Sequence, residues 1–210
     1  MPSTHLAETV DVSTMDWPEL RAAVADCRAC ALCETRTRTV FGVGDERASW
    51  LVIGEAPGAE EDRRGEPFVG SAGRLLDQML AALGLSREID VFIANVLKCR
   101  PPGNRDPSPD ERRHCEPFLR RQIELLSPRV ILVAGRTAAQ SLLGTEASIA
   151  SLRGRVHAYR LGARSIPVVV TFHPAYLLRN TADKARAWAD LCLARKVHDE
   201  PAASQASDRV

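Results

Sequence analysis

The sequence has no apolar run long enough to cross a membrane, and its first residues lack the apolar core of a secretion signal. Its formal net charge is only +1 over 210 residues. A charge this small excludes a strong overall attraction to nucleic acid or to anionic membranes, so any polyanion site must be a local patch. No internal repeat is present. We expect a soluble, cytoplasmic monomer with no membrane partner.

The composition is that of ordinary globular material, with 45% hydrophobic and 26% charged residues. This length is enough for one sizeable core. Residues 1–15 are polar and unpatterned, which predicts a flexible N-terminal tail. Residues 198–210 are rich in Ala, Ser and polar residues, which predicts a disordered C-terminal tail. Residues 16–197 are left as a single folded domain.

Four short apolar, β-branched runs are each followed by polar or Gly/Pro-rich residues. We expect them to be strands, at residues 49–53, 91–94, 130–134 and 168–172. Segments with helical spacing lie around them, and we expect helices starting after residue 16 and over residues 72–83, 109–126, 137–143 and 183–197. Capping boxes at residues 16–19 and 108–111 mark two helix starts. This alternation predicts an α/β fold, a single three-layer α/β/α domain with a central, mostly parallel four-stranded sheet.

Polar residues stand where three of these strands end. They are Glu55, Asn95 and His173, which are far apart in the sequence. In an open parallel sheet the carboxyl ends of the strands line the ligand crevice. The three side chains should therefore meet at one site.

Six cysteines need an explanation other than disulfides, which are rare in the cytosol. Cys27 and Cys30 form a C-x-x-C pair in a polar stretch, while Cys99 lies in a Pro-rich loop and Cys115 in the next helix. Four thiolates suit either a [4Fe–4S] cluster or a structural zinc ion, and the spacing alone does not choose between them. Cys33 continues the same rhythm and is a spare candidate ligand.

The loop at residues 54–62 is tight and carries several carboxylates. It lacks the Gly-Lys-Ser/Thr element of a phosphate loop, and it does not match a dinucleotide fingerprint. Taken alone, it also fits a solvated acidic loop. Phe68 follows in a loop between Pro67 and Gly70, where it is either a core anchor or a surface on which a flat ring stacks.

Four motifs together make the sequence similar to family 4 uracil-DNA glycosylases, the iron–sulfur branch of that superfamily. They are Gly-Glu-Ala-Pro-Gly-Ala-Glu-Glu-Asp at 54–62, Pro-Phe-Val-Gly-Ser-Ala-Gly at 67–73, Asn-Val-Leu-Lys-Cys-Arg-Pro-Pro at 95–102 and His-Pro-Ala-Tyr-Leu-Leu-Arg-Asn at 173–180. Each motif alone is weak, but their order over roughly residues 25–195 is highly specific. Cys27, Cys30 and Cys115 also fall in matching order.

The resemblance implies a monofunctional enzyme of base excision repair. Such an enzyme hydrolyses the N-glycosidic bond of uracil in single- or double-stranded DNA, releases free uracil and leaves an abasic site. It also implies a [4Fe–4S] cluster on Cys27, Cys30, Cys99 and Cys115, which orders the DNA-facing loop between the last two thiols. A related branch that bonds covalently to DNA carries an Arg-Arg-Ile-His insertion, which is absent from residues 100–105. We therefore expect turnover.

By this resemblance the extruded uracil stacks on Phe68. Asn95 reads the base edge on which uracil and cytosine present opposite donors and acceptors. His173 faces O2 of the base, where negative charge develops, and backbone N–H groups of the turn at residues 55–56 assist. The alternative interpretation is that Asn95 is only a turn-forming residue at the end of a strand.

One position departs from the best-known uracil glycosylases, which have a water-activating Asp where this chain has Ala56. Glu55, Glu61 and Asn104 are then the candidates for placing the water or tuning the pocket. In the family, the equivalent of Glu61 is also thought to exclude the methyl group of thymine.

The resemblance further implies that Leu177 enters the minor groove as a wedge that fills the vacated stack. Its alternative role is an apolar helix start. Local cations would contact phosphates, although single arginines are usually just solvated; they are Lys98, Arg100, Arg105, Arg153, Arg155 and Arg179. Two other classes of function stay open, a non-catalytic iron–sulfur module that binds DNA or its lesions, and a zinc-stabilised α/β hydrolase.

Overall fold

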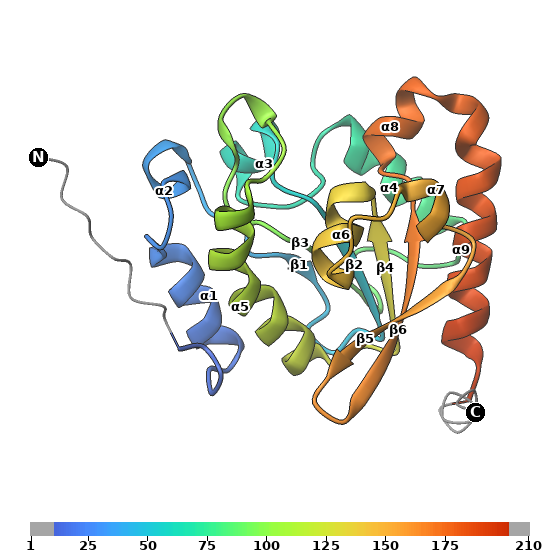
Figure 1. Ribbon diagram of the computed structural model, residues 1–210, viewed down its shortest axis with the longest axis horizontal. Coiled ribbons are helices and arrows are strands. Elements are labelled where there is room, and N and C mark those ends of the chain that lie inside the picture. Colours follow the sequence, from blue (N-terminus) through green and yellow to red (C-terminus); the bar gives the residue numbers. More distant parts are fainter. Residues whose placement is uncertain (1–10, 202–210) are drawn as a thin grey trace, which may run out of the picture.

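A computed structural model describes residues 11–201, and its centre is one mixed sheet with the strand order β1-β3-β2-β4-β6-β5 (Figure 1). Four neighbouring strands are parallel, as predicted: β3 (Val91–Asn95), β2 (Trp50–Gly54), β4 (Val130–Ala134) and β6 (Arg164–Thr171). All five residues of β2, β3 and β4 are buried, because helices cover both faces of the sheet.

The predicted four-stranded sheet is too small, since the sheet has six strands. β1 (Val43–Gly44) and β5 (Val156–Leu161) pair antiparallel with the two outer parallel strands. β1 has only two residues, and β5 alternates exposed with half-buried residues. Neither shows the continuous apolar run that marks a strand buried on both faces, so the sequence pattern does not reveal them.

The five predicted helices are present with small shifts at their ends. They are α1 (Trp17–Asp26), α4 (Ser71–Ala81), α5 (Pro109–Leu126), α6 (Arg136–Leu143) and α9 (Lys184–Asp199). Both capping boxes form, at the first turns of α1 and α5. The structure adds short elements: α2 (Leu32–Thr35), α3 (Ala59–Arg64), α7 (Ile149–Leu152), α8 (Pro174–Arg179), and the 3₁₀ turns η1 (Pro102–Asn104) and η2 (Thr181–Asp183).

Two apolar cores lie on opposite faces of the sheet. Leu51 and Ile53 of β2 belong to the core shared with α1, α5 and α6. Trp50 and Val52 belong to the core shared with α4 and α9. Figure 1 shows these helix groups on either side of the strands. The predicted three-layer arrangement is therefore present, and within residues 11–201 no helix has the length and apolarity to span a bilayer.

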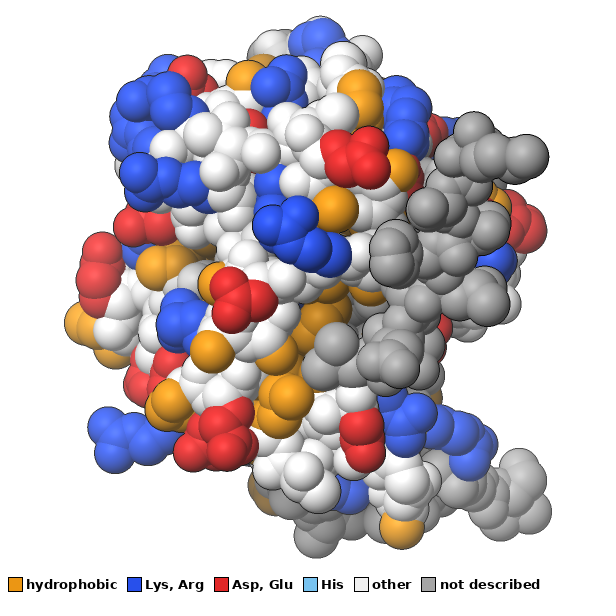
Figure 2. Space-filling model, turned by 90° about the vertical axis from the view of Figure 1, so that its left-hand side faces the viewer, with side chains coloured by type: hydrophobic (Ala, Val, Ile, Leu, Met, Phe, Trp, Pro, Cys, Tyr) orange, Lys and Arg blue, Asp and Glu red, His pale blue; other side chains and the backbone are white. Residues whose placement is uncertain are grey.

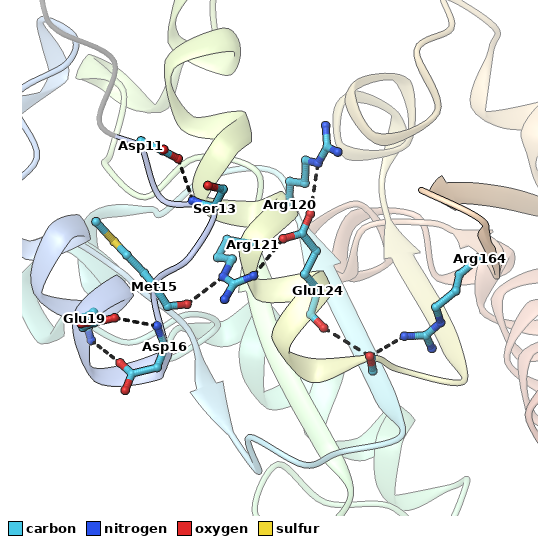
Figure 3. Close-up of polar contacts among 10 residues, drawn as sticks. Asp11, Ser13, Met15, Asp16, Glu19, Arg120, Arg121, Glu124 and Arg164 are labelled. Carbon is cyan, nitrogen blue, oxygen red and sulfur yellow. Dashed lines mark hydrogen bonds and ion pairs between the residues drawn. The ribbon is translucent and has the colours of Figure 1, made fainter.

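The N-terminal segment is packed further upstream than predicted. Val12 is only 5% exposed and lies in the first core. Arg121 of α5 donates from Nε to the Met15 carbonyl at 2.7 Å, as Figure 3 shows. The predicted flexible tail at residues 1–15 is therefore too long, because residues 11–15 are held against α5. Residues 1–10 lie outside the described part of the chain.

The C-terminal boundary is also later than predicted. α9 continues to Asp199, and the His198 ring stacks on Trp50 with centroids 4.8 Å apart. The same ring lies 2.7 Å from the Ser49 hydroxyl. The folded domain thus extends past residue 198, and the rest of the predicted tail, from residue 202, lies outside the described residues.

Removing the cap of α1 should destabilise the fold. Asp16 Oδ1 accepts a hydrogen bond from Glu19 N at 2.9 Å, and Glu19 Oε2 accepts one from Asp16 N at 2.9 Å. We predict that Asp16→Ala lowers the free energy of unfolding by about 1 kcal/mol, measured by urea denaturation. Asp11→Ala is the matched control, because Asp11 is exposed and accepts from Ser13 N at 2.9 Å outside any helix. Equal effects of the two substitutions would contradict the capping role.

Candidate active site and cysteine cavity

A pocket opens at the carboxyl edge of the parallel strands. Every side chain expected to act on the base lines it, namely Glu55, Ala56, Glu61, Phe68, Asn95, Asn104 and His173. Gly58, Ala72, Ala175, Tyr176 and Arg179 complete the lining. These residues come from five separate segments of the chain, and the parallel sheet brings the segments together.

Gly54 allows two walls of this pocket to approach each other. It is the last residue of β2 and lies opposite Asn95 in the register of β2 and β3. A Cβ at this position would be 2.4 Å from Asn95 Oδ1 and 2.6 Å from Phe68 Cζ. Only glycine fits between the amide and the phenyl ring without displacing one of them.

Phe68 is held in an unusual conformation by its surroundings. Its φ of 54° lies in the left-handed region, which is uncommon for a bulky residue. Arg87 stabilises the loop by donating to the Phe68 carbonyl at 2.9 Å while it pairs with Asp77 at 2.7 Å. A Cβ on Gly73 would lie 1.7 Å from that same carbonyl. The ring therefore has a fixed place in the pocket wall, and its centroid lies 5.5 Å from that of His173.

His173 is placed and tuned by the start of α8. Its Nδ1 accepts from Ala175 N at 3.1 Å, so a neutral ring carries its proton on Nε2. Burial lowers the pKa of His173 to about 4, with a smaller contribution from Arg179. The imidazole is then neutral at pH 7, and its Nε2–H is available as a donor. Gly135, with φ of 100°, permits the close packing, because a Cβ there would lie 3.1 Å from His173 Cβ.

The candidate residues for placing water differ in the hydrogen bonds that their side chains already make. Glu61 Oε1 accepts from Val69 N at 3.0 Å and from Gly70 N at 3.2 Å, so it organises the Phe68 loop. Asn104 is exposed and accepts from Arg100 Nε at 2.7 Å.

Glu55 is the carboxylate with a perturbed environment at this site. Burial raises its pKa, while a hydrogen bond from the Thr137 side chain opposes the shift, and Asp106 raises the pKa further. Arg136 and Arg112 act in the opposite direction. A raised carboxyl pKa in a cleft is typical of groups that move or position protons.

Lys98 does not reach the surface, which corrects the expectation that it contacts a phosphate. The residue is 2% exposed, and its Nζ donates to the Asn95 carbonyl at 2.8 Å and to Gln122 Oε1 at 2.6 Å. Burial lowers the pKa of Lys98 to about 7, and Cys115 and Cys99 oppose that shift. The side chain supports the strand end that carries Asn95.

Two further DNA-binding assignments are corrected by burial. Leu177 is 1% exposed and packs in the second core, so it cannot serve as a wedge in this conformation, whereas Leu178 is 43% exposed. A Leu-Leu pair in the sequence does not tell which residue faces out. The Arg153 side chain is 7% exposed and pairs with Asp190 at 2.7 Å, so it is not free to bind a phosphate.

The other expected cations lie at or near the surface. Arg179 is exposed beside the pocket, and Arg155 is exposed ahead of β5. Arg105 is half-exposed and forms a two-pronged pair with Glu111, which lowers the pKa of that carboxyl to about 2. Figure 2 shows Lys and Arg side chains gathered toward the top of the face that carries α1 and α2.

The cysteines expected to bind a metal group line a second, smaller cavity. Cys27, Cys30, Cys99 and Cys115 border it, together with Cys33. Within residues 11–201, no three such ligands are close enough together to hold a single metal ion. Four thiols around one cavity are a ligand set that suits either an iron–sulfur cluster or a zinc ion.

The surroundings of this cavity also fit an anionic cluster. Burial raises the pKa of Cys99 to about 11 and that of Cys115 to about 12, so at pH 7 these two thiols are protonated when no metal group is bound. Arg36 donates from Nη1 to Cys99 Sγ at 3.2 Å, and Lys98 lines the same cavity. Cationic side chains beside buried sulfurs suit a group that binds as thiolates.

The geometry defines an α/β protein whose strand-end pocket is lined by a phenyl ring, an amide and an imidazole. The sequence model of the uracil DNA glycosylase superfamily matches residues 41–192. A type-4 uracil-DNA glycosylase of Archaeoglobus fulgidus is 48% identical over 159 residues, which are 74% of this chain and 79% of the relative. The type-4 uracil-DNA glycosylase of Thermotoga maritima is 46% identical over 78% of this chain and 83% of its own. That of Pyrobaculum aerophilum is 39% identical over 85% and 93%.

The chain therefore belongs to the uracil-DNA glycosylase superfamily and, within it, to the type-4 branch. This confirms the family inferred from the four motifs, and the fold agrees with it in class and in its parallel core.

Filling the space at Gly54 should close the pocket. Gly54→Ala places a methyl group against the Asn95 amide and the Phe68 ring, so we predict that activity on the substrate proposed below falls by about a hundredfold or more, as expected when pocket geometry is lost. Gly162→Ala is a control, because a Cβ there meets nothing within 4 Å although its φ of 58° adds some strain. A Gly54→Ala enzyme with wild-type kcat/KM would contradict the tight fit.

The neutral state of His173 has its own test. Because burial lowers its pKa to about 4, the ring should stay neutral from pH 8 down to about pH 5 and gain a proton only near pH 4. An NMR titration of the ring resonances measures this midpoint. In the unfolded chain the same ring is protonated below its ordinary pKa, so stability associated with His173 is lost as the pH falls below that value. A midpoint above pH 6 in the folded protein would contradict the assignment.

Proposed function

We propose that this chain is a monofunctional uracil-DNA glycosylase of base excision repair, which hydrolyses the N-glycosidic bond of uracil in DNA. One observation carries the proposal: Phe68, Asn95 and His173 meet in a single pocket of a chain that belongs to the type-4 branch. The phenyl ring, the amide and the imidazole are the three kinds of group needed to stack on, read and polarise one extruded base.

Recognition is assigned to the Asn95 side chain. Its backbone is fixed at the end of β3 and by Lys98, and the residue is 2% exposed. The amide oxygen accepts from N3–H of uracil, and the amide nitrogen donates to O4. Cytosine reverses this pattern and leaves buried polar groups unpaired, which a hydrogen-bonding site rejects strongly.

Bond cleavage depends on charge developing at O2 of the base. The C1′–N1 bond breaks, its electron pair leaves with uracil, and the sugar becomes oxocarbenium-like. The His173 Nε2–H donates to O2 and, as a fixed donor, stabilises the negative charge that develops there. Glu55, whose pKa burial raises, is proposed to place the water that adds to C1′. Glu61 and Asn104 shape the pocket around it.

The four thiols of Cys27, Cys30, Cys99 and Cys115 are proposed to hold a [4Fe–4S] cluster. Bound there, the cluster would supply a cross-link between the segment after α1 and the loop before α5, with no part in the hydrolysis. That loop carries Arg100 and Arg105. Cys33 lines the same cavity and is the alternative ligand. A brown protein whose iron content matches four per chain supports this assignment, and a colourless protein with stoichiometric zinc contradicts it.

Contact with DNA is assigned to the rim of the pocket. Arg179, Arg105, Arg100 and Arg155 are the proposed phosphate contacts, and Leu178 replaces Leu177 as the proposed wedge because it is the exposed member of the pair. Release with turnover is proposed in place of a covalent bond to DNA. His114 is the histidine nearest in sequence to residues 100–105, the region where the related, covalently bonding branch carries its Arg-Arg-Ile-His insertion. The His114 side chain lines the cysteine cavity, and its Nδ1 lies 2.8 Å from the Asp110 carbonyl.

The direct test is release of free uracil from oligonucleotides containing U:A, U:G or single-stranded uracil. We predict multiple turnovers on these substrates, with the chain acting as a monomer. Binding of uracil-containing DNA without release would contradict the proposal and favour a non-catalytic DNA-binding module.

Loss of the imidazole should remove most of the rate. We predict that His173→Ala lowers kcat by about a hundredfold to a thousandfold, as for the loss of one oxyanion donor, with little change in DNA affinity. Asn95→Asp is the companion variant, and it should erode discrimination between uracil and cytosine. Full activity of His173→Ala would remove His173 from the mechanism.

A further inference from the structure

Arg153 is a buried cation that the proposed mechanism does not use. Its Nε pairs with Asp190 Oδ2 at 2.7 Å, and its Nη2 donates to the Arg186 carbonyl at 2.7 Å. Only 7% of the Arg153 side chain and 1% of the Asp190 side chain are exposed. Such a pair gives little net stability compared with apolar residues of similar size, so its fixed geometry calls for another explanation.

The pair extends to the helix beside the pocket through two aromatic rings. The Arg153 guanidinium carbon lies 4.0 Å from the centroid of the Phe172 ring. Phe172, 6% exposed, stacks on Tyr176 with centroids 4.9 Å apart and an interplanar angle of 20°. Phe172 immediately precedes His173, and Tyr176 belongs to α8 and lines the pocket.

The 3₁₀ turn η2, which follows α8, is tied to the same network. Tyr176 donates its hydroxyl proton to Asp183 Oδ2 at 2.7 Å. Arg186 donates to Asp183 Oδ1 at 3.1 Å and lies 5.6 Å from the Phe172 ring centroid. Contacts thus run from α7 and α9 through the end of β6 to α8, as Figure 1 places these elements next to one another.

A helix of six residues has little stability of its own, so its orientation is set by the contacts it makes. The buried Leu177 holds one face of α8 in the second core. The Tyr176 ring, held by Phe172 and Asp183, fixes the rotation of the helix. This rotation decides whether Leu178 and Arg179 point outward beside the pocket.

We propose that Arg153, Asp190, Phe172 and Tyr176 form a brace that holds α8 in the orientation needed to wedge into duplex DNA. They are positioning residues and act through Leu178. The inference rests on the proposed glycosylase function. A wedge offsets the cost of unstacking and unpairing a base, which is least for a base that is already single-stranded. The brace should therefore matter for duplex substrates and be nearly dispensable for single strands.

The test compares kcat/KM on a U:A duplex with that on the same uracil strand alone. The double variant Arg153→Met with Asp190→Leu removes both charges, so that no unpaired buried charge is left. We expect its duplex activity to fall by about tenfold or more, because the wedge then offsets less of the cost of unstacking, while single-strand activity stays within about twofold. Leu178→Ala should give the same pattern, and the exposed Arg160→Met of β5 is the matched control.

Tyr176→Phe keeps the stacked ring and removes only the hydrogen bond to Asp183, so it tests the brace even if the double variant does not fold. We expect a smaller loss of kcat/KM than in the double variant, again confined to the duplex substrate.

Fluorescence of 2-aminopurine placed next to the uracil reports unstacking without chemistry when it is measured in the His173→Ala background. We expect this fluorescence to be lower when a brace substitution is added to His173→Ala than with His173→Ala alone.

Equal losses on both substrates, or no loss on either, would overturn the brace. An inactive wild-type chain has a different meaning: absence of uracil release from both substrates would overturn the glycosylase function itself and, with it, this inference.

Discussion

The parallel pairing of β2 with β3 is the constraint on which the site depends. It sets Gly54 opposite Asn95, and the missing side chain at Gly54 lets the amide and the Phe68 ring come within contact distance of the same point. β4 and β6 continue the sheet and deliver Gly135 and His173 to the same edge. A register shift of one residue between β2 and β3 would turn the buried side chains of the shifted strand to the other face of the sheet. It would also separate these groups.

Burial then gives the assembled groups their chemistry. The same low-polarity surroundings keep His173 neutral, raise the pKa of Glu55 and hold the thiols of Cys99 and Cys115 in the protonated form. At the base, a neutral donor and a carboxyl group with a raised pKa suit the stabilisation of a leaving anion and the positioning of water. At the cysteines, Arg36 donates to Cys99 Sγ and would offset the negative charge of the proposed thiolate ligands.

Much of this arrangement can be predicted from the sequence, for identifiable reasons. β2, β3, β4 and the second half of β6 are buried and so appear as unbroken apolar runs. The capping boxes at Asp16 and Ser108 mark helix starts by side-chain chemistry alone. Glu55, Asn95 and His173 follow strand ends, which is why their convergence was predictable. The sequence pattern does not indicate the edge strands β1 and β5, because one is two residues long and the other alternates exposed with half-buried residues.

The errors concern which way a side chain points. The family resemblance predicts a DNA contact for Leu177, and placement in loops at one sheet edge predicts phosphate contacts for Lys98 and Arg153, yet all three side chains are buried. A Lys that donates to the carbonyl at a strand end and an Arg that pairs with Asp190, 37 positions away, look the same in the sequence as cations on the surface.

The most direct test of the central claim is an experimental structure of the protein with free uracil bound. The account predicts a uracil ring parallel to the Phe68 ring, with N3 and O4 on the Asn95 amide and O2 within hydrogen-bonding distance of His173 Nε2. Uracil bound in another cavity, or in this pocket with neither Asn95 nor His173 in contact, would contradict it.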